Sequence, residues 1–283
     1  MAIGFIGLGK MGAAMAPHLA MAGHRVIGHD LVKPPVLPDG VDFTPDLGSL
    51  VGCQIIIAML PDGDVVETVV TSLLERGCGA DVVDMSSSHP DVSRRLHSTL
   101  AAHGQAFVDA PVSGGVGRAE TAELQIMVGG DEVDVMSLAP VLSCMGHVTH
   151  MGPAGCGHAM KALNNYVSAA GLIASFEALA TAGQLGIDEE RFVEVINRST
   201  GRNNTTEAKI ARYVLSGAFD SGFALKLMAK DVMIAESLAS AAGFDGPVTG
   251  AVRGFLDDEL ASLGEAADHT ELYLSVTKGA KDG

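Results

Sequence analysis

Short runs of apolar and β-branched residues recur through the first half of the chain, and segments compatible with helix lie between most of them. Such alternation favours a parallel sheet with helices on both faces. We therefore predict an α/β fold with an N-terminal doubly wound sheet of the Rossmann type, whose strands lie at Ile3–Ile6, Val26–His29, Ile55–Met59, Asp81–Met85, Ala106–Asp109 and Leu124–Val128.

The strand signal stops after Val148, and the remaining sequence is typical of helices. A long helix rich in alanine and leucine is predicted to start near Ala159 and to end at Gly183, after the glycine-rich junction Gly152–Gly157. We predict two domains, residues 1–153 and an all-α domain of residues 154–283, joined by this long interdomain helix. Further helices are predicted at Asp188–Asn197, Thr205–Leu215, Ala224–Ala242, Pro247–Leu263 and Asp268–Thr277, with Asp188 and Asp268 as N-caps.

Charge and composition argue against several kinds of partner. The 283 residues carry a formal net charge of -16 with only 18 Lys and Arg, so nucleic acid and anionic membranes would be repelled over most of the surface. A small anion can still bind where a few cations and backbone amides gather. The longest uninterrupted apolar run, Ile55–Leu60, is far shorter than the roughly 18 residues of a membrane span. We expect no membrane association.

The cysteines and histidines show no metal-binding spacing. Cys53, Cys78, Cys144 and Cys156 lie far apart and form no Cys-x-x-Cys pair, so we expect reduced thiols and no metal site. The first glycine of the turn described next comes at position 7, which leaves no room for a targeting segment before the fold. A cytoplasmic protein is expected.

A glycine-rich turn follows the first predicted strand and opens a helix. In Gly7-Leu8-Gly9-Lys10-Met11-Gly12, the first glycine permits the tight turn, the second lets a pyrophosphate approach the backbone, and the third lets the helix pack on the strand. The helix N-terminus adds amide groups and partial positive charge. We predict that a dinucleotide binds here, contacted by Gly7, Leu8, Gly9, Lys10, Met11 and Gly12.

An acidic residue follows the second predicted strand. Asp30 lies about 20 residues beyond the turn, where an acid accepts hydrogen bonds from the adenosine ribose hydroxyls. Because its carboxylate would repel the 2′-phosphate of NADP, we predict NAD as the cofactor. The nearby Lys33 keeps NADP open as the less favoured alternative.

Four segments together resemble the β-hydroxyacid dehydrogenase family, which includes 3-hydroxyisobutyrate dehydrogenase and tartronate semialdehyde reductase. The turn carries the family's methionine, Met11, before the third glycine, and Lys230-Asp231 is similar to a paired motif of its helical domain. The segment Asp109–Gly115 resembles its substrate-binding segment, and Gly155–Asn165 resembles its catalytic helix. The resemblance covers nearly the whole chain.

The resemblance implies roles for individual residues. Lys161 would be the catalytic acid/base, and Asn165, four residues later on the same helix face, a substrate contact. The substrate carboxylate would be held by Ser113, Gly114 and Gly115. Further cofactor contacts would come from Leu60, Pro61, Ser87 and Lys230, the last of which would reach from the helical domain into an interdomain cleft.

The chemistry of an alcohol oxidation agrees with this assignment. It needs a base for the hydroxyl proton and a cofactor for the hydride. A lysine serves as a base only if its pKa, about 10.4 in water, is lowered by burial or by a neighbouring cation. Lys161 lies early in an apolar helix at the domain junction, which favours burial, and the nearby His158 is a candidate for tuning its pKa.

We predict NAD-dependent oxidation of a small 3-hydroxy acid resembling 3-hydroxyisobutyrate to its semialdehyde, or the reverse reduction. Two alternatives remain open: an imine reductase, in which the lysine is usually replaced, and a non-catalytic dinucleotide-binding scaffold of the same fold. The stretch Gly201–Thr206 replaces an aromatic-containing segment of the hydroxyisobutyrate enzymes, which leaves the acid unidentified. The apolar helices of the second half, together with the family resemblance, predict a homodimer or homotetramer.

Overall fold

The computed structural model of the protein describes residues 1–279. Its contacts divide the chain into two units, Met1–Lys161 and a second unit that begins at Ala162. The division falls within the first turns of a long helix, α6, Cys156–Gln184.

The first unit is built on one mixed sheet in the order β3-β2-β1-β4-β5-β6-β8-β7, with β9 also paired to β8. From β3 to β6 every neighbouring pair is parallel, and all six predicted strands are confirmed. The strands are β1 Ala2–Ile6, β2 Arg25–His29, β3 Val41–Thr44, β4 Ile55–Ala58, β5 Asp81–Asp84, β6 Phe107–Asp109, β7 Val112–Ser113, β8 Leu124–Gly129 and β9 Gly146–Gly152.

The prediction of a wholly parallel sheet is wrong at one edge. Strand β8 runs antiparallel to both β6 and β7. Only the short helix α4, Gly115–Glu120, lies between β7 and β8. A parallel connection needs a crossover of a dozen or more residues, whereas a short return permits antiparallel pairing. The chain therefore folds back on itself after the predicted substrate segment.

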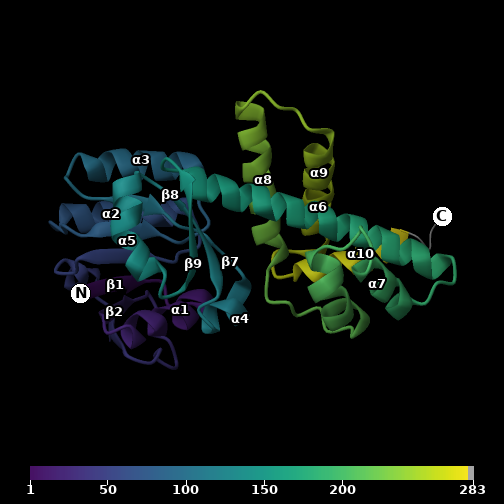
Figure 1. Ribbon diagram of the computed structural model, residues 1–283, viewed down its shortest axis with the longest axis horizontal. Helices are drawn as coiled ribbons and strands as arrows, with labels where there is room; N and C mark the ends of the chain where they lie inside the picture. The colour runs from purple at the N-terminus through teal and green to yellow at the C-terminus, as the bar shows by residue number, and fades with distance from the viewer. Residues whose placement is uncertain (280–283) are drawn as a thin grey trace. The chain divides into compact units, whose positions relative to one another are not determined.

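Helices cover both faces of this sheet (Figure 1). Successive residues of β4 point to opposite sides: Ile55 and Ile57 join one apolar cluster, and Ile56 and Ala58 join the other. This is the pattern of a strand buried on both faces. The first cluster contains α1, Lys10–Met21, α4 and α5, Glu132–Leu142, and the second contains α2, Gly63–Glu75, and α3, Pro90–Ala101.

The regular elements among the described residues of the second unit are helices and helical turns, with one isolated β-bridge between Ala224 and Asp268. After α6 come α7 Glu189–Asn197, the π-helix η2 Thr205–Leu215, α8 Leu225–Ala241, α9 Pro247–Leu263, the 3-10 turn η3 His269–Glu271 and α10 Leu272–Gly279. All the predicted helices are present, although Thr205–Leu215 is a π-helix and Asp268–Thr277 is split into η3 and α10. Both predicted N-caps are confirmed: Asp188 accepts from the Arg191 amide at 2.9 Å, and Asp268 forms a capping box with Glu271.

Helix α6 is the longest element of the structure. By length and composition alone it would also suit a membrane span, a test that a long core helix passes equally well. Its residues Leu172, Phe176 and Leu179 are buried among apolar side chains of η2, α8, α9 and α10. This burial accounts for the apolar composition of its second half.

Candidate functional site

The glycine-rich turn joins β1 to α1, and two of its glycines are required by the protein's own packing. Gly7 has a φ of +96°, and a Cβ placed there would lie 2.2 Å from the carbonyl oxygen of Met59. A Cβ on Gly12 would lie 1.9 Å from the carbonyl oxygen of Gly7. The backbone at the start of α1 and at the ends of β1 and β4 is therefore packed too closely to admit a side chain at Gly7 or Gly12.

Gly9 differs from the other two glycines of the turn, Gly7 and Gly12. Its φ is -65°, which any residue adopts, and a Cβ there would meet no atom of the described structure within 4 Å. It is the N-cap of α1, whose first turn has no acidic residue and no capping side chain. The first amides of a helix lack partners within the helix and bind anions well. Because no described residue requires a glycine here, the open space fits a ligand phosphate.

Asp30, directly after β2, is fixed beside this turn. Its carboxylate accepts hydrogen bonds from the Leu8 amide at 2.7 Å and from the Val32 amide at 3.3 Å. The acid predicted for the adenosine ribose therefore lies next to the glycine-rich turn, as the strand order requires. Its contact with the ribose stays a prediction.

The other predicted cofactor residues of this unit follow β4 and β5. Leu60 donates its amide hydrogen to Ser86 Oγ at 2.9 Å, which ties the segment after β4 to the segment after β5. Pro61 and Ser87 lie next to these two residues in the sequence. Because β1, β2, β4 and β5 are parallel neighbours, the carboxyl ends of all four share one edge of the sheet. This is the edge at which open α/β sheets bind their ligands.

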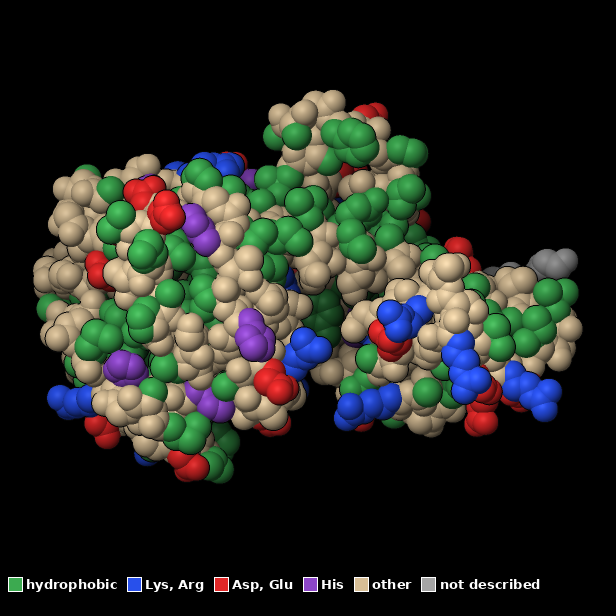
Figure 2. Space-filling model, viewed as in Figure 1, with side chains coloured by type: hydrophobic (Ala, Val, Ile, Leu, Met, Phe, Trp, Pro, Cys, Tyr) green, Lys and Arg blue, Asp and Glu red, His purple; other side chains and the backbone are tan. Residues whose placement is uncertain are grey.

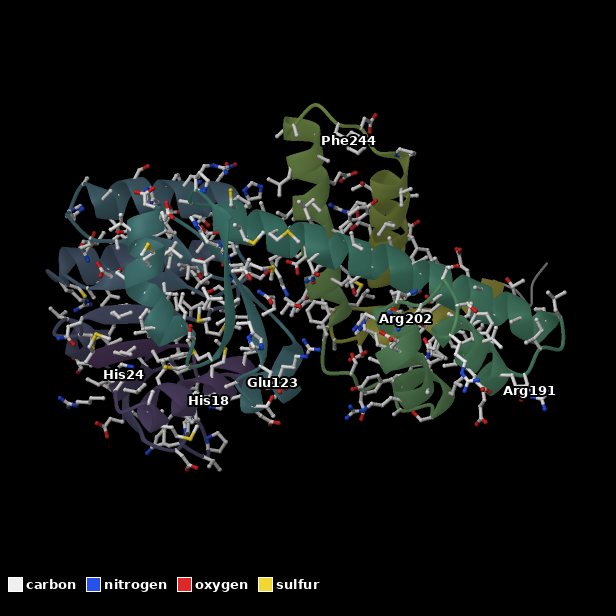
Figure 3. The ribbon with its side chains drawn as sticks, viewed as in Figure 1. His18, His24, Glu123, Arg191, Arg202 and Phe244 are labelled. Carbon is white, nitrogen blue, oxygen red and sulfur yellow. The ribbon has the colours of Figure 1, made fainter. Side chains whose placement is uncertain are left out.

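The predicted substrate segment runs from β7 into α4. Gly114 and Gly115 have φ of +138° and +68°, a region that favours glycine, so this backbone conformation explains both residues. A cation that sequence reasoning missed, Arg118, packs against Gly114: a Cβ on Gly114 would lie 2.8 Å from the Arg118 side chain. His18 of α1 bonds the Ala119 carbonyl oxygen at 2.8 Å and so joins α4 to the helix of the glycine-rich turn (Figure 3).

Lys161 lies beside this segment. Its Nζ donates a hydrogen bond to the carbonyl oxygen of Val112 at 2.8 Å, and Val112 directly precedes Ser113. Lys161 and Val112 are 49 residues apart in sequence, so the hydrogen bond makes the predicted acid/base and the predicted carboxylate-binding segment adjacent in the first unit. The lysine is half-buried.

The start of α6 is fixed to the sheet by Asp109, at the end of β6. Its carboxylate accepts from the amides of Gly155 at 2.7 Å and His158 at 2.8 Å. Burial raises the pKa of Asp109, against the opposing influence of His158 and of these two amides. A Cβ on Gly157 would lie 2.4 Å from the Met127 carbonyl oxygen, so this glycine lets the helix reach the strand ends.

The predicted residues of the second unit have their own contacts. Asn165 is buried and donates its side-chain amide to Asp231 Oδ2, while Asn164 donates to Asn165 Oδ1 at 3.0 Å. Asp231, which follows Lys230 in the paired motif, thus accepts a hydrogen bond from the predicted substrate contact Asn165. The roles predicted for Asn165 and Lys230 stay predictions. Among the described residues no group of His, Cys, Asp and Glu could hold a metal ion.

Comparison with known proteins identifies the family. Residues 2–152 match the NAD binding domain of 6-phosphogluconate dehydrogenase, and residues 155–276 match the NAD-binding domain of NADP-dependent 3-hydroxyisobutyrate dehydrogenase. Mitochondrial 3-hydroxyisobutyrate dehydrogenase of Drosophila melanogaster is 36% identical, over 84% of this chain and 78% of that protein. The 2-(hydroxymethyl)glutarate dehydrogenase of Eubacterium barkeri is also 36% identical, over 87% and 83%.

A solved structure has the same fold along its whole length. It is the 3-hydroxyisobutyrate dehydrogenase of Mycobacterium tuberculosis with L-serine, which is 31% identical, has a TM-score of 0.86, and aligns over 97% of this chain and 98% of that one. Sequence, fold and the geometry of the glycine-rich turn thus agree. The chain belongs to the β-hydroxyacid dehydrogenase family and is an oxidoreductase that binds a nicotinamide dinucleotide.

Proposed function

We propose that the protein is an NAD-dependent dehydrogenase of small 3-hydroxy acids, with Lys161 as the general acid/base. The observation that carries this proposal is the hydrogen bond from Lys161 Nζ to the Val112 carbonyl oxygen, next to Ser113. This contact supports the proposal because the amine of Lys161 lies beside the segment to which we assign the substrate carboxylate. A 3-hydroxy acid has its carboxylate and its reacting hydroxyl two carbons apart, so one small molecule can engage both.

Each residue of the site has a separate role in the proposed oxidation. Ser113 and the amides of Gly114 and Gly115 bind the carboxylate. The neutral amine of Lys161 takes the hydroxyl proton during oxidation and returns it during reduction. The bound dinucleotide supplies the acceptor for the hydride that leaves the same carbon. The roles of Asn165 as a substrate contact and of Lys230 as a cofactor contact rest on the family resemblance.

The choice of substrate class is supported by the relatives. The compounds in their names, 3-hydroxyisobutyrate, 2-(hydroxymethyl)glutarate and L-serine, are all acids with a hydroxyl on the β carbon. They differ in the group on the α carbon. We therefore expect the protein to require a carboxylate and a β-hydroxyl in its substrate. We expect it to select among such acids by the variable group on the α carbon.

NAD is the proposed cofactor because of Asp30. Its carboxylate is fixed beside the turn by the Leu8 amide and would repel a 2′-phosphate. The experiment is a panel of 3-hydroxyisobutyrate, glycerate, 3-hydroxypropionate and L-serine, each assayed with NAD and NADP in parallel, with a 2-hydroxy acid and a cyclic imine as controls. Turnover of at least one 3-hydroxy acid with NAD is expected. Turnover of the imine alone, or tight NADH binding without any turnover, would contradict the proposal.

We also propose that the protein works as a homo-oligomer. In the second unit Leu163 and Val167 of α6 are exposed, as are Met233 of α8 and Phe244 in the loop before α9. Figure 2 shows hydrophobic side chains gathered over α8 and α9, and Figure 3 shows Phe244 at their tips. Exposed apolar patches of this kind often mark subunit contacts. Light scattering at several concentrations tests this, and a monomer throughout would contradict it.

A further inference from the structure

Six buried polar side chains of the first unit have no part in the proposed chemistry. Each is at most 3% exposed, and they come from four separate elements. They lie at the end of β5 and in the loop after it, on α3, at the end of β6 and on α6. The six residues, which we call the buried network, are Asp84, Ser86, Ser88, Ser93, Asp109 and His158.

His158 is the centre of the buried network. Its Nε2 lies 3.1 Å from the Ser86 carbonyl oxygen, and its Nδ1 lies 2.7 Å from Ser93 Oγ. A carbonyl oxygen only accepts, so Nε2 carries the hydrogen and Nδ1 accepts from the serine hydroxyl when the imidazole is neutral. Two carboxylates flank the ring without bonding it directly: Asp84 Oδ2 lies 3.8 Å from Nε2, and Asp109 Oδ2 lies 3.7 Å from Nδ1.

One side of the buried network fixes the segments predicted to hold the cofactor. Ser86 accepts from the Leu60 amide through Oγ, and its own amide donates to Asp84 Oδ1 at 2.9 Å. Ser88 Oγ donates to Asp84 Oδ2 at 3.0 Å. Ser86 therefore connects the loops that contain Pro61 and Ser87 to His158, because it bonds Leu60 through its hydroxyl and His158 through its carbonyl oxygen.

The other side fixes the helix that carries Lys161. Asp109 accepts the amide of His158, and His158 lies three residues before Lys161, on the same face of α6. The ring of His158 is thus the link between the end of β5 and the start of α6. An apolar side chain could fill this space, but it would bond neither Ser86 nor Ser93.

We propose that His158 is a positioning residue, which sets Lys161 relative to the loops Leu60–Pro61 and Ser86–Ser88 by bridging Ser86 and Ser93. This inference rests on the proposed function only in treating Lys161 as the acid/base. His158 touches neither substrate nor cofactor in this account. It acts through α6 and through Ser86, and a displacement of about 1 Å at a reacting group is enough to cost about 10²-fold in rate.

Three variants test this role. His158→Leu removes both ring hydrogen bonds and is expected to lower kcat about 10²-fold, with a much smaller change in the KM for NAD. His158→Gln keeps an amide donor for the Ser86 carbonyl oxygen and should restore kcat to within about tenfold of the wild-type value. Ser93→Ala removes only the Nδ1 partner, leaves the remaining link intact, and provides a milder change if His158→Leu does not fold.

The control variant is Leu142→Ala, which removes a buried apolar side chain at the end of α5 that is not a member of the buried network. It should lower the melting temperature and leave the kcat of the folded fraction unchanged. If His158→Leu behaves in the same way, or if His158→Gln is no better than His158→Leu, the buried network is only structural and the proposal is overturned.

A second measurement separates this proposal from the proposed function. The rate at which an amine-acylating reagent modifies Lys161, relative to the exposed Lys226, is followed by peptide mass spectrometry in the wild type and in each variant. We expect His158→Leu to raise this ratio, because Lys161 would be held less firmly against Val112. A raised ratio in a protein that oxidises no 3-hydroxy acid would leave the positioning role standing and refute the function. An unchanged ratio would refute the positioning role.

Discussion

At the scale of single residues, the glycine-rich turn separates what the fold needs from what a ligand needs. Gly7 and Gly12 are required because a side chain at either would collide with backbone. Gly9 meets no such demand, and its backbone conformation suits any residue. The three glycines of the motif are therefore present for two different physical reasons, packing of the backbone and space for a ligand. Substitutions can distinguish the two.

Gly9→Ala is expected to fold normally and to bind NADH at least about tenfold more weakly, because the added methyl occupies the space of the pyrophosphate. Gly12→Ala should instead destabilise the protein by about 1 to 3 kcal/mol, the usual cost of overpacking. Melting temperature and NADH fluorescence titration measure the two effects. Gly52→Ala, at another glycine with open space, serves as the control. Normal NADH binding by Gly9→Ala would refute the assignment of this space to the cofactor.

Asp30 makes a separate prediction about cofactor choice. Asp30→Asn keeps an oxygen for the Leu8 amide but loses the charge, so the ratio of kcat/KM for NAD to that for NADP should fall by about tenfold or more, as expected for a charge-assisted hydrogen bond. Asp42→Asn, an exposed acid on β3 paired with Arg25 at 3.8 Å, should leave the ratio unchanged. An unaltered ratio in Asp30→Asn would show that Asp30 does not set the preference.

At the scale of elements, the sequence pattern located strands that are buried on both faces and missed those that are not. The run Ile55–Ala58 is buried at every position and is visible as an apolar run. Strand β3 lies at one edge of the sheet, β7 has only two residues, and much of β9, which pairs with β8 at the other edge, is exposed, so none of them carries a continuous apolar run. Edge strands need fewer apolar residues, and the partners that stabilise them are distant in sequence.

The candidate site was predictable to the extent that it follows from local motifs. Gly9 lies at the start of α1, Asp30 lies directly after β2, and Lys161 lies near the start of α6, as the sequence pattern predicted. The buried network around His158 was not foreseen as a unit, because its hydrogen bonds join β5, α3, β6 and α6, and no spacing in the sequence encodes them. The signal that was available, polar residues following strands that are otherwise buried, marks Ser86 and Asp109 but not Ser93.

The cap of the C-terminal helices contains a histidine that should make stability depend on pH. His269 is 2% exposed, and its Nδ1 bonds the Phe223 carbonyl oxygen at 3.0 Å. Burial, and then the charge of Lys209, lower its pKa to about 4, with Asp268 opposing. Burial also lowers the pKa of Lys209 to about 8. The folded second unit thus excludes a proton that the unfolded chain binds below about pH 6.5.

Because the unfolded state binds more protons between about pH 4 and 6.5, the free energy of unfolding should fall as pH is lowered through this window, by up to about 2 to 3 kcal/mol. His269→Asn keeps a donor for Phe223 and should flatten this dependence. The exposed His103→Asn should not. The chain has no tryptophan, and its three tyrosines all lie in the second unit. Tyrosine fluorescence during urea unfolding therefore reports on this unit directly. An equally steep acid limb in His269→Asn would contradict the account.

At the scale of the whole molecule, binding of the dinucleotide should stabilise the first unit and leave a signature in thermal unfolding. A ligand at about 100 times its Kd adds about 2.7 kcal/mol, which raises the melting temperature by several degrees. NADH should do this more than NADPH at equal concentration, and Gly9→Ala should reduce both shifts, because the pyrophosphate is common to the two cofactors. No shift with either cofactor in the wild type would contradict the dinucleotide site.

The central claim is that Lys161 is the acid/base of a 3-hydroxyacid dehydrogenase, and its most direct test is the turnover of Lys161→Ala. With the best acid of the substrate panel and saturating NAD, we predict that kcat falls by about 10² to 10⁴-fold, while NADH affinity stays unchanged. Lys226→Ala, an exposed lysine paired with Glu265 at 3.3 Å, should keep wild-type activity. A Lys161→Ala enzyme with near-normal turnover would contradict the claim.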